Sequence, residues 1–181
     1  TIRHLFSMQS GLDYDLGAPA IKEVVAKPNA TTREICGAMA KKPLQFDPGE
    51  RYQYSLSHDV LAAVVEVVSG KTFYEYLRDE IFEPLEMKEI GFRPTEEQKT
   101  RFAQQYNYDM ATYASSVKKT ENEFQLSPMF ESGGAGLFTN LDSYMPVIDA
   151  LANKGTALNG YQLLKPETVE LMRTNQLKEE Q

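Results

Sequence analysis

The sequence predicts a mainly α (α+β) fold, with about eight helices and a few short strands. Capping boxes, in which a threonine is followed three residues later by Glu or Gln, begin several of the helical patterns. These boxes are Thr31/Glu34, Thr72/Glu75 and Thr95/Gln98. A long helix is indicated by the run from Val60 to Val68, which is apolar apart from Glu66. Residues 103–126 lack a helical period and are rich in Tyr and Thr, which favours two strands.

The N-terminal part of the chain is expected to be helical. Thr1 can cap a short helix over residues 2–8, which Ser10-Gly11 ends. A second helix is expected over residues 20–26. A third begins at the Thr31/Glu34 box and runs to about Lys41, because Pro43 cannot continue it.

The central stretch, residues 46–70, joins a turn, an extended piece and a helix. Pro48-Gly49 is a turn pair, and the residues up to Tyr54 are extended by composition. Ser57 is expected to cap the following helix. Because Val60–Val68 is apolar apart from Glu66, we expect this helix to be buried over most of its circumference. Gly70 suits the left-handed residue that ends a helix.

The next helix is expected over Phe73–Phe82, followed by a short charged surface helix over residues 95–102. A core face is predicted for the first of these helices; its residues are Tyr74, Leu77, Arg78 and Ile81. We expect a hairpin after them, with a polar turn near residues 119–122.

The C-terminal part begins with a glycine-rich turn at residues 132–136 that leads into a strand at Leu137-Phe138. Thr139 or Asn140 can cap a helix over Leu141–Asn153, and Pro166 begins a last helix. The inward stripe expected for the Leu141–Asn153 helix is Tyr144, Val147, Ile148 and Leu151.

Composition limits the function classes. The length of 181 residues and a hydrophobic content of 41% fit a single domain over residues 1–181. The formal net charge is −7, and no basic cluster exceeds two residues, so nucleic acid is not expected as a partner. The sequence contains no membrane-spanning run, no metal-ligand pattern and no complete nucleotide motif, so no cofactor is expected. Cys36, the lone cysteine, is expected to be a small core residue.

Tyr54 is the candidate catalytic residue. It precedes the start of a helix by a few residues, and the positive end of the helix dipole favours an ionised phenol there. A phenol with an ordinary pKa of roughly 10 needs further positive charge before it can act as a base at neutral pH. A structural tyrosine that packs its ring and hydrogen-bonds its hydroxyl is the alternative.

Three stretches of the sequence, at residues 2–12, 54–87 and 132–137, carry motifs in a characteristic order. Together they resemble the penicillin-recognising serine hydrolases, in particular the group of class C β-lactamases, esterases and D,D-peptidases. Tyr54-Ser55-Leu56 stands where that family has Tyr-x-Asn, and Pro84-Leu85-Glu86-Met87 closes the second helix after it. Residues 2–12 resemble the family's His-Leu-Leu-x-x-x-Ser-Gly-Leu stretch, and residues 132–137 its glycine-rich turn. The resemblance covers most of the chain and implies the helical subdomain of the serine β-lactamase/D,D-peptidase-like fold.

The resemblance also implies a chemistry. In the family a serine in Ser-x-x-Lys attacks an acyl carbonyl, the lysine and the motif tyrosine move protons, and a Lys-Thr-Gly or His-x-Gly strand holds the substrate. Here only the tyrosine motif is present, because Ser115/Lys118 and Ser116/Lys119 follow Tyr54 and lie in a non-helical stretch. The chain is therefore expected to be an internal fragment of a longer hydrolase and to be inactive alone.

The site implied by the resemblance consists of Tyr54 as the base, with Leu56, Gly133 and Gly134 in contact with substrate. Leu56 replaces the family's Asn and cannot hydrogen-bond an amide, which favours an esterase over a β-lactamase or peptidase. The expected partner is a small acyl substrate or a cell-wall peptide. The family favours an extracytoplasmic location, and loss of the main sheet would favour self-association of the chain.

Two other classes of function remain open. A family member without turnover would be a penicillin-binding-like or cell-wall-peptide-binding module. A purely structural helical module would have no pocket, and mutation of Tyr54 would then change stability alone.

Overall fold

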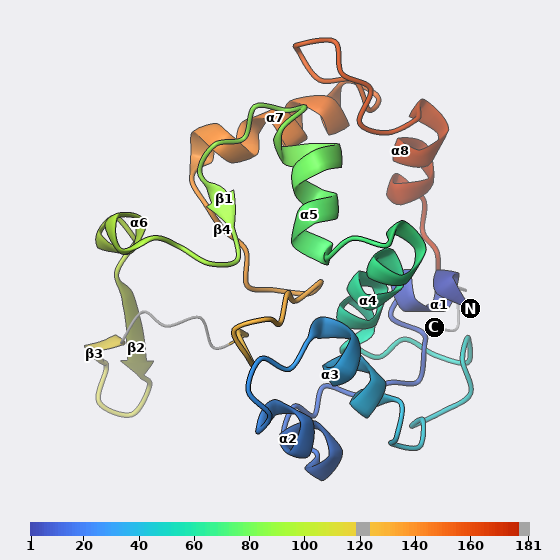
Figure 1. Ribbon diagram of the computed structural model, residues 1–181, viewed down its shortest axis with the longest axis vertical. Coiled ribbons are helices and arrows are strands. Elements are labelled where there is room, and N and C mark those ends of the chain that lie inside the picture. Colours follow the sequence, from blue (N-terminus) through green and yellow to red (C-terminus); the bar gives the residue numbers. More distant parts are fainter. Residues whose placement is uncertain (119–123, 178–181) are drawn as a thin grey trace.

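The computed structural model describes residues 1–118 and 124–177, in which helices dominate and the strands are short (Figure 1). The helices are α1 (Ile2–Phe6), α2 (Pro19–Val25), α3 (Thr32–Met39), α4 (Ser57–Ser69), α5 (Phe73–Leu77), the π-helical turn η1 (Arg78–Phe82), α6 (Glu96–Thr100), α7 (Leu141–Ala152) and α8 (Pro166–Arg173). The strands are β1 (Ile90–Gly91), β2 (Gln105–Asp109), β3 (Ala114–Lys118) and β4 (Phe138–Thr139). No helix in the described part of the chain has the length and apolarity needed to span a membrane.

Local helix signals in the sequence are confirmed. All three predicted capping boxes form, with each threonine side chain accepting a hydrogen bond from the backbone three residues later. Gly70 ends α4 in the left-handed conformation at φ 73°. Asn140, one of the two predicted caps, accepts from the Ser143 amide at the start of α7.

Two hydrophobic cores hold the helices together. The first joins α2, α3 and the start of α4 around Ile21, Ile35, Met39 and Leu56. The second joins η1, the turn after it and α7, and its buried residues are Phe82, Leu85, Met87, Ala150 and Ala157. Beside the second core β1 pairs antiparallel with β4, although these strands are 47 residues apart (Ile90 opposite Thr139, Gly91 opposite Phe138; 138 − 91 = 47).

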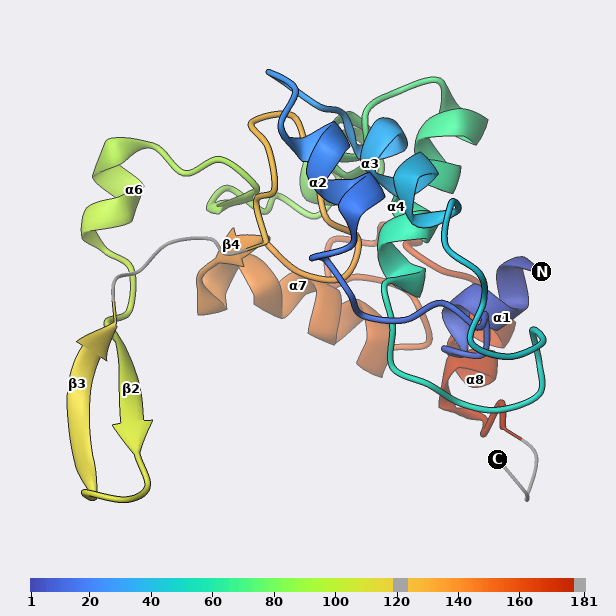
Figure 2. The ribbon, with the colours of Figure 1, turned by 90° about the horizontal axis from the view of Figure 1, so that it is seen from below.

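The predicted hairpin exists, and the predicted position of its turn is wrong. β2 and β3 pair antiparallel from Gln105/Lys118 to Asp109/Ala114, so residues 110–113 make the turn. The Asp109 carboxylate accepts from the Ala111 amide and the Thr112 hydroxyl, which stabilises this earlier turn. Residues 119–122 lie outside the described residues. The hairpin projects from the body of the molecule in both views (Figures 1 and 2).

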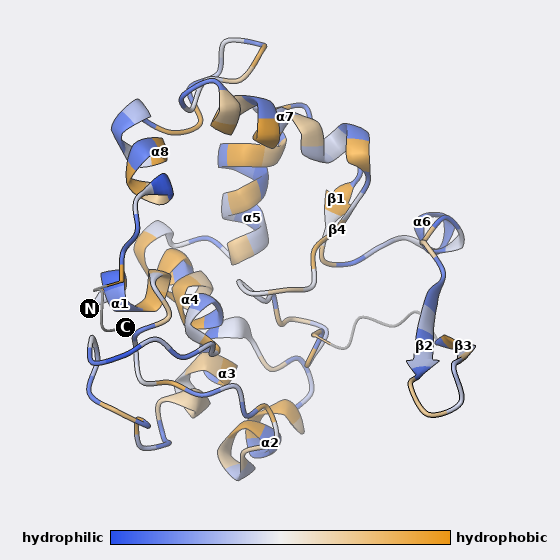
Figure 3. Ribbon diagram, turned by 180° about the vertical axis from the view of Figure 1, so that it is seen from behind, coloured by the Kyte–Doolittle hydropathy of each residue, from blue (hydrophilic) through white to orange (hydrophobic). Residues whose placement is uncertain are grey.

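The prediction that α4 is buried around most of its circumference is wrong. Its buried residues are Ser57, Asp59, Ala62 and Glu66, whereas Val68 is 81% exposed. The inward face carries these polar groups because they hydrogen-bond to neighbouring segments. The apolar face lines an open groove of about 540 Å³ with residues of α1 and α5, and Figure 3 shows hydrophobic residues along α4 and α5.

The prediction of which α7 residues face inward is also partly wrong. Ser143 and Ala150 are the buried residues of this helix, and Val147 packs against the second core. Tyr144 and Ile148 are exposed. Ser143 faces inward because its hydroxyl accepts a hydrogen bond from the Glu89 amide, a contact that hydrophobicity does not reveal.

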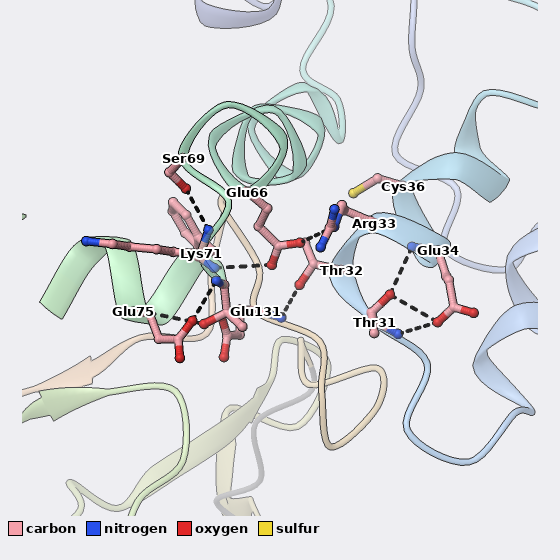
Figure 4. Close-up of polar contacts among 12 residues, drawn as sticks. Thr31, Thr32, Arg33, Glu34, Cys36, Glu66, Ser69, Lys71, Glu75 and Glu131 are labelled. Carbon is pink, nitrogen blue, oxygen red and sulfur yellow. Dashed lines mark hydrogen bonds and ion pairs between the residues drawn. The ribbon is translucent and has the colours of Figure 1, made fainter. Parts of the chain in front are cut away.

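Two buried glutamates fix the start of α5 (Figure 4). Glu66 of α4 accepts the Phe73 amide at 3.2 Å, and Glu131 accepts the Tyr74 amide at 2.6 Å. Their residues are 5% and 3% exposed, respectively. Each carboxylate also pairs with an arginine, Glu66 with Arg33 at 3.2 Å and Glu131 with Arg93 at 2.8 Å. The first two amides of α5 are thus satisfied by side chains from two other segments, and the third by the cap Thr72.

Replacement of Glu131 by Ala should therefore destabilise the chain by about 1–3 kcal/mol, because the Tyr74 amide and Arg93 lose a buried acceptor. Glu96→Ala is the matched control, since Glu96 pairs with Lys99 and its side chain is 90% exposed. Urea unfolding measures both variants. Equal midpoints for the two would show that the buried contact contributes nothing.

Candidate active site

Tyr54 lies on a segment without regular secondary structure, three residues before α4, and is 60% exposed. Its ring stacks on that of Tyr14, with 5.3 Å between the ring centroids and 22° between the planes. The phenol is therefore open to a substrate and in contact with a second aromatic ring. Asp59 lies in the first turn of α4, where a carboxylate weakens the positive potential that the helix dipole produces at this end of the helix.

The Tyr54 segment is held by an N-terminal segment that lies beside it. The Gln53 amide donates to the Met8 carbonyl at 2.8 Å, and the Leu56 amide donates to the Asp13 carbonyl at 3.1 Å. These two bonds bracket Tyr54. Gly11, between Met8 and Asp13, has φ 83°, and a Cβ there would lie 2.4 Å from the Phe46 carbonyl oxygen. Glycine is required at this close approach.

A buried chain of hydroxyls reinforces this contact. The Ser57 hydroxyl lies 2.7 Å from the hydroxyls of both Ser10 and Ser55. The expected capping role of Ser57 is therefore wrong, because Ser57 is the first helical residue of α4 and its hydroxyl points to these partners. Ser10 belongs to one of the family-like stretches and Ser55 to another, so the hydroxyl of Ser57 connects the two stretches.

Leu56 does not lie on the surface beside Tyr54. It is 4% exposed and belongs to the first core. Its side chain lines a cavity of about 10 Å³ with Ile21 and Met39, which is too small for a substrate. Its contact with substrate stays a prediction, and its observed role is packing beneath the Tyr54 segment.

Gly133 and Gly134 approach α4. A Cβ on Gly133 would lie 2.1 Å from the His58 carbonyl oxygen and 2.9 Å from the Ala62 Cβ. A Cβ on Gly134 would lie 3.2 Å from an oxygen of Asp59. The glycine run thus allows backbone to pack against the first turns of α4, and its contact with substrate stays a prediction.

Asp59 is a buried ionisable group that connects α4 to the segment before the glycines. Its carboxylate accepts the Ser132 hydroxyl at 2.5 Å, immediately before the glycines. Burial raises the pKa of Asp59, and the hydrogen bond from Ser132 opposes that rise. A helix that begins near Ser57 has Asp59 in its first turn, but no pattern in the sequence indicates that Asp59 is buried.

Cys36 is a core residue, as predicted. Its thiol donates to the Asp59 carbonyl at 3.2 Å. Burial, followed by the charges of Asp59 and Glu66, raises the pKa of Cys36 to about 12, so the thiolate is not accessible at neutral pH.

The serines that join the Tyr54 segment to its neighbours are not accessible as nucleophiles. Ser10, Ser55 and Ser57 are all buried. Ser115 and Ser116 lie on β3, in the hairpin that projects away from α4 in both views (Figures 1 and 2). Among residues 1–118 and 124–177, no group of three His, Cys, Asp or Glu could hold a metal ion.

Comparison with known proteins gives the same family as the three stretches. The sequence profile of the Beta-lactamase family matches residues 1–180. The lovastatin esterase of Penicillium rubens is 31% identical over 178 residues, which cover 95% of this chain and 43% of the esterase. The structure of EstCE1, a hydrolase with promiscuous acyltransferase activity, matches with a TM-score of 0.74 at 26% identity, covering 96% of this chain and 50% of EstCE1. Simvastatin synthase (LovD) from Aspergillus terreus matches with a TM-score of 0.75 at 26% identity, covering 99% and 44%.

These similarities define a helical part of the serine β-lactamase/penicillin-binding-protein fold, as the sequence predicted. The chain belongs to the Beta-lactamase family. Its relatives include esterases and acyltransferases, which supports a serine-hydrolase-like function. The chain spans 40–45% of the length of the curated relatives.

Gly133→Ala should destabilise the chain by roughly 1–3 kcal/mol, because the added methyl group collides with the backbone of His58. Gly37→Ala adds the same group to α3 where nothing lies within 4 Å. This control should gain about 0.5–1 kcal/mol from helix propensity. Thermal and urea unfolding of both variants would test the close approach, and a tolerated Gly133→Ala would refute it.

Asp59→Asn should alter how stability depends on pH. Because the pKa of Asp59 is raised in the folded chain, folding takes up a proton, and this residue's contribution to stability falls as pH rises from its ordinary pKa of 3.8 through the raised value. Asn cannot titrate, so the free energy of unfolding of the variant should increase relative to that of the native chain as pH rises between the ordinary and the raised pKa of Asp59. Urea midpoints across that range measure the difference, and a constant difference would argue against a raised pKa.

Proposed function

We propose that these 181 residues are the helical part of a longer serine hydrolase or acyltransferase, in which Tyr54 moves the proton of a serine supplied by another segment. The observation that carries the proposal is the exposed Tyr54 phenol on a backbone bracketed by hydrogen bonds to Met8 and Asp13. A phenol that moves protons must be open to substrate and held in one place.

The relatives support acyl transfer as the reaction class. The matched proteins include a lovastatin esterase and a hydrolase with promiscuous acyltransferase activity. Both act on acyl groups, by transfer to water or to another acceptor. The serines of the hydroxyl chain beneath Tyr54, namely Ser10, Ser55 and Ser57, are buried, and we infer that the chain alone is inactive.

Ester substrates fit the residues better than β-lactams. Leu56 replaces the Asn that the family pattern would use for an amide, and its side chain is buried. A buried apolar residue at this position offers no hydrogen-bonding group to the amide of a penicillin or peptide. Gly133 and Gly134 would shape the pocket wall through the backbone they bring to α4.

The second candidate function is a binding module for small molecules or cell-wall peptides without turnover. It would keep the Tyr54 segment and lack the nucleophile in the full gene product. Assay of that full product separates the two candidates.

The test compares the 181-residue chain with the complete gene product, using short-chain p-nitrophenyl esters and a chromogenic cephalosporin. We expect no turnover by the chain and ester hydrolysis by the complete product, with Tyr54→Phe lowering kcat by about 10²–10⁴-fold. Tyr52→Phe is the matched control, since Tyr52 is an exposed tyrosine two residues away.

Three results would contradict parts of the proposal. Turnover by the chain alone that Tyr54→Phe abolishes would contradict its inactivity. Faster cleavage of the cephalosporin would contradict the ester preference. Equal activity of Tyr54→Phe and Tyr52→Phe would remove Tyr54 from the mechanism.

A further inference from the structure

Tyr14 is the aromatic neighbour of Tyr54, and the mechanism proposed above leaves it without a role. The ring centroids are 5.3 Å apart and the planes differ by 22°, which lies within the range of offset-stacked aromatic pairs. Tyr14 is 40% exposed, so neither ring is buried in a core. Two exposed rings stay stacked only if their backbones are held in place, because side-chain entropy opposes the ordering of both.

The backbone beneath the two rings meets this requirement. The Leu56 amide donates to the carbonyl of Asp13, the residue before Tyr14. The Gln53 amide donates to the Met8 carbonyl on the other side of Tyr54. The two tyrosines therefore project from segments that are hydrogen-bonded to each other, although 40 positions separate them in the sequence (54 − 14 = 40).

Ion pairs fix Tyr14 on both sides. The Lys42 ammonium lies 2.5 Å from the Asp13 carboxylate and 3.0 Å from the Asp15 carboxylate. Both aspartates adjacent to Tyr14 are thus bound to one cation from the segment after α3. Asp15 also accepts the Gly17 amide at 2.9 Å, which orders the turn that follows.

We propose that Tyr14 is a positioning residue, whose ring face holds the Tyr54 ring in the orientation required for proton transfer. The inference rests on the proposed function of Tyr54. An exposed tyrosine otherwise samples several staggered χ1 rotamers, whereas a catalytic group must stay within about 0.5 Å of its productive position. Contact with a held ring removes the other rotamers.

The surroundings of the Tyr14 phenol favour its neutral form. Burial, and then the nearby Tyr54 and Asp59, raise the pKa of Tyr14. Tyr14 therefore keeps its proton at neutral pH and presents an uncharged ring face to its neighbour. Its contribution is the ring, so the hydroxyl should be dispensable.

The experiment uses the complete gene product with Tyr14→Phe, which keeps the ring, and Tyr14→Leu, which removes it. Tyr113→Leu is the control, because Tyr113 is an exposed tyrosine in the turn between β2 and β3. We expect Tyr14→Leu to lower kcat for an aryl ester at least tenfold with little change in KM, since displacement of a catalytic group by about 1 Å costs up to 10²-fold. Tyr14→Phe and Tyr113→Leu should stay close to the native rate.

NMR of ring-labelled tyrosine gives a readout that does not depend on activity. In Tyr14→Leu the Tyr54 ring signals should lose the ring-current shift of a stacked neighbour, whereas Tyr14→Phe should retain it. If Tyr14→Leu does not fold, Tyr14→Met keeps an unbranched apolar side chain and makes the same test.

The outcomes separate the two proposals. Native kcat in Tyr14→Leu, with Tyr54→Phe inactive, would overturn the positioning role and leave the function of Tyr54 intact. Equal losses in Tyr14→Phe and Tyr14→Leu would overturn positioning by the ring and assign the effect to the hydroxyl. Full activity of Tyr54→Phe would overturn the proposed function and the positioning role with it.

Discussion

The architecture depends on two carboxylates that are buried at the start of α5. Glu66 and Glu131 bind the first amides of that helix, and each also binds an arginine. Burial raises the pKa of Glu66, and the Phe73 amide and Arg33 oppose the rise, so the fold supplies partners that keep a costly charge in place. Arg33, Glu66 and Glu131 come from α3, α4 and the segment before the glycine run, respectively (Figure 4). Because α3 and α4 belong to the first core and α5 leads into the second, this contact links the two cores.

The segment that contains Glu131 also positions the helix that follows the Tyr54 segment. The Glu131 amide donates to the Thr32 hydroxyl of α3, and Ser132, the next residue, donates to Asp59 of α4. The glycines that follow then pack against the first turns of α4. The Tyr54 segment leads directly into that helix, so its position is set through α4 by polar contacts and on its other side by the N-terminal segment.

Much of the fold could be predicted because its signals are local. A capping box or a left-handed glycine needs only a few neighbouring residues, and these predictions are confirmed at Thr31, Thr72 and Gly70. Which side of α4 is buried could not be predicted, because hydrophobicity identifies apolar residues but does not show which of them other segments cover. Tyr14 was missed for a related reason, since its contact with Tyr54 joins positions far apart in the sequence and has no periodic signal.

The inward polar face of α4 explains why its apolar side is left in an open groove. A helix that commits Asp59 and Glu66 to hydrogen bonds inside the chain must turn Leu61, Val64 and Val68 the other way, because residues seven apart share a face. Those apolar residues meet Phe6 and Phe73 around the groove. Burial of the polar partners and exposure of the apolar face are therefore two consequences of the same helical geometry. The hydrogen bonds of Asp59 and Glu66 hold the helix into which the Tyr54 segment leads.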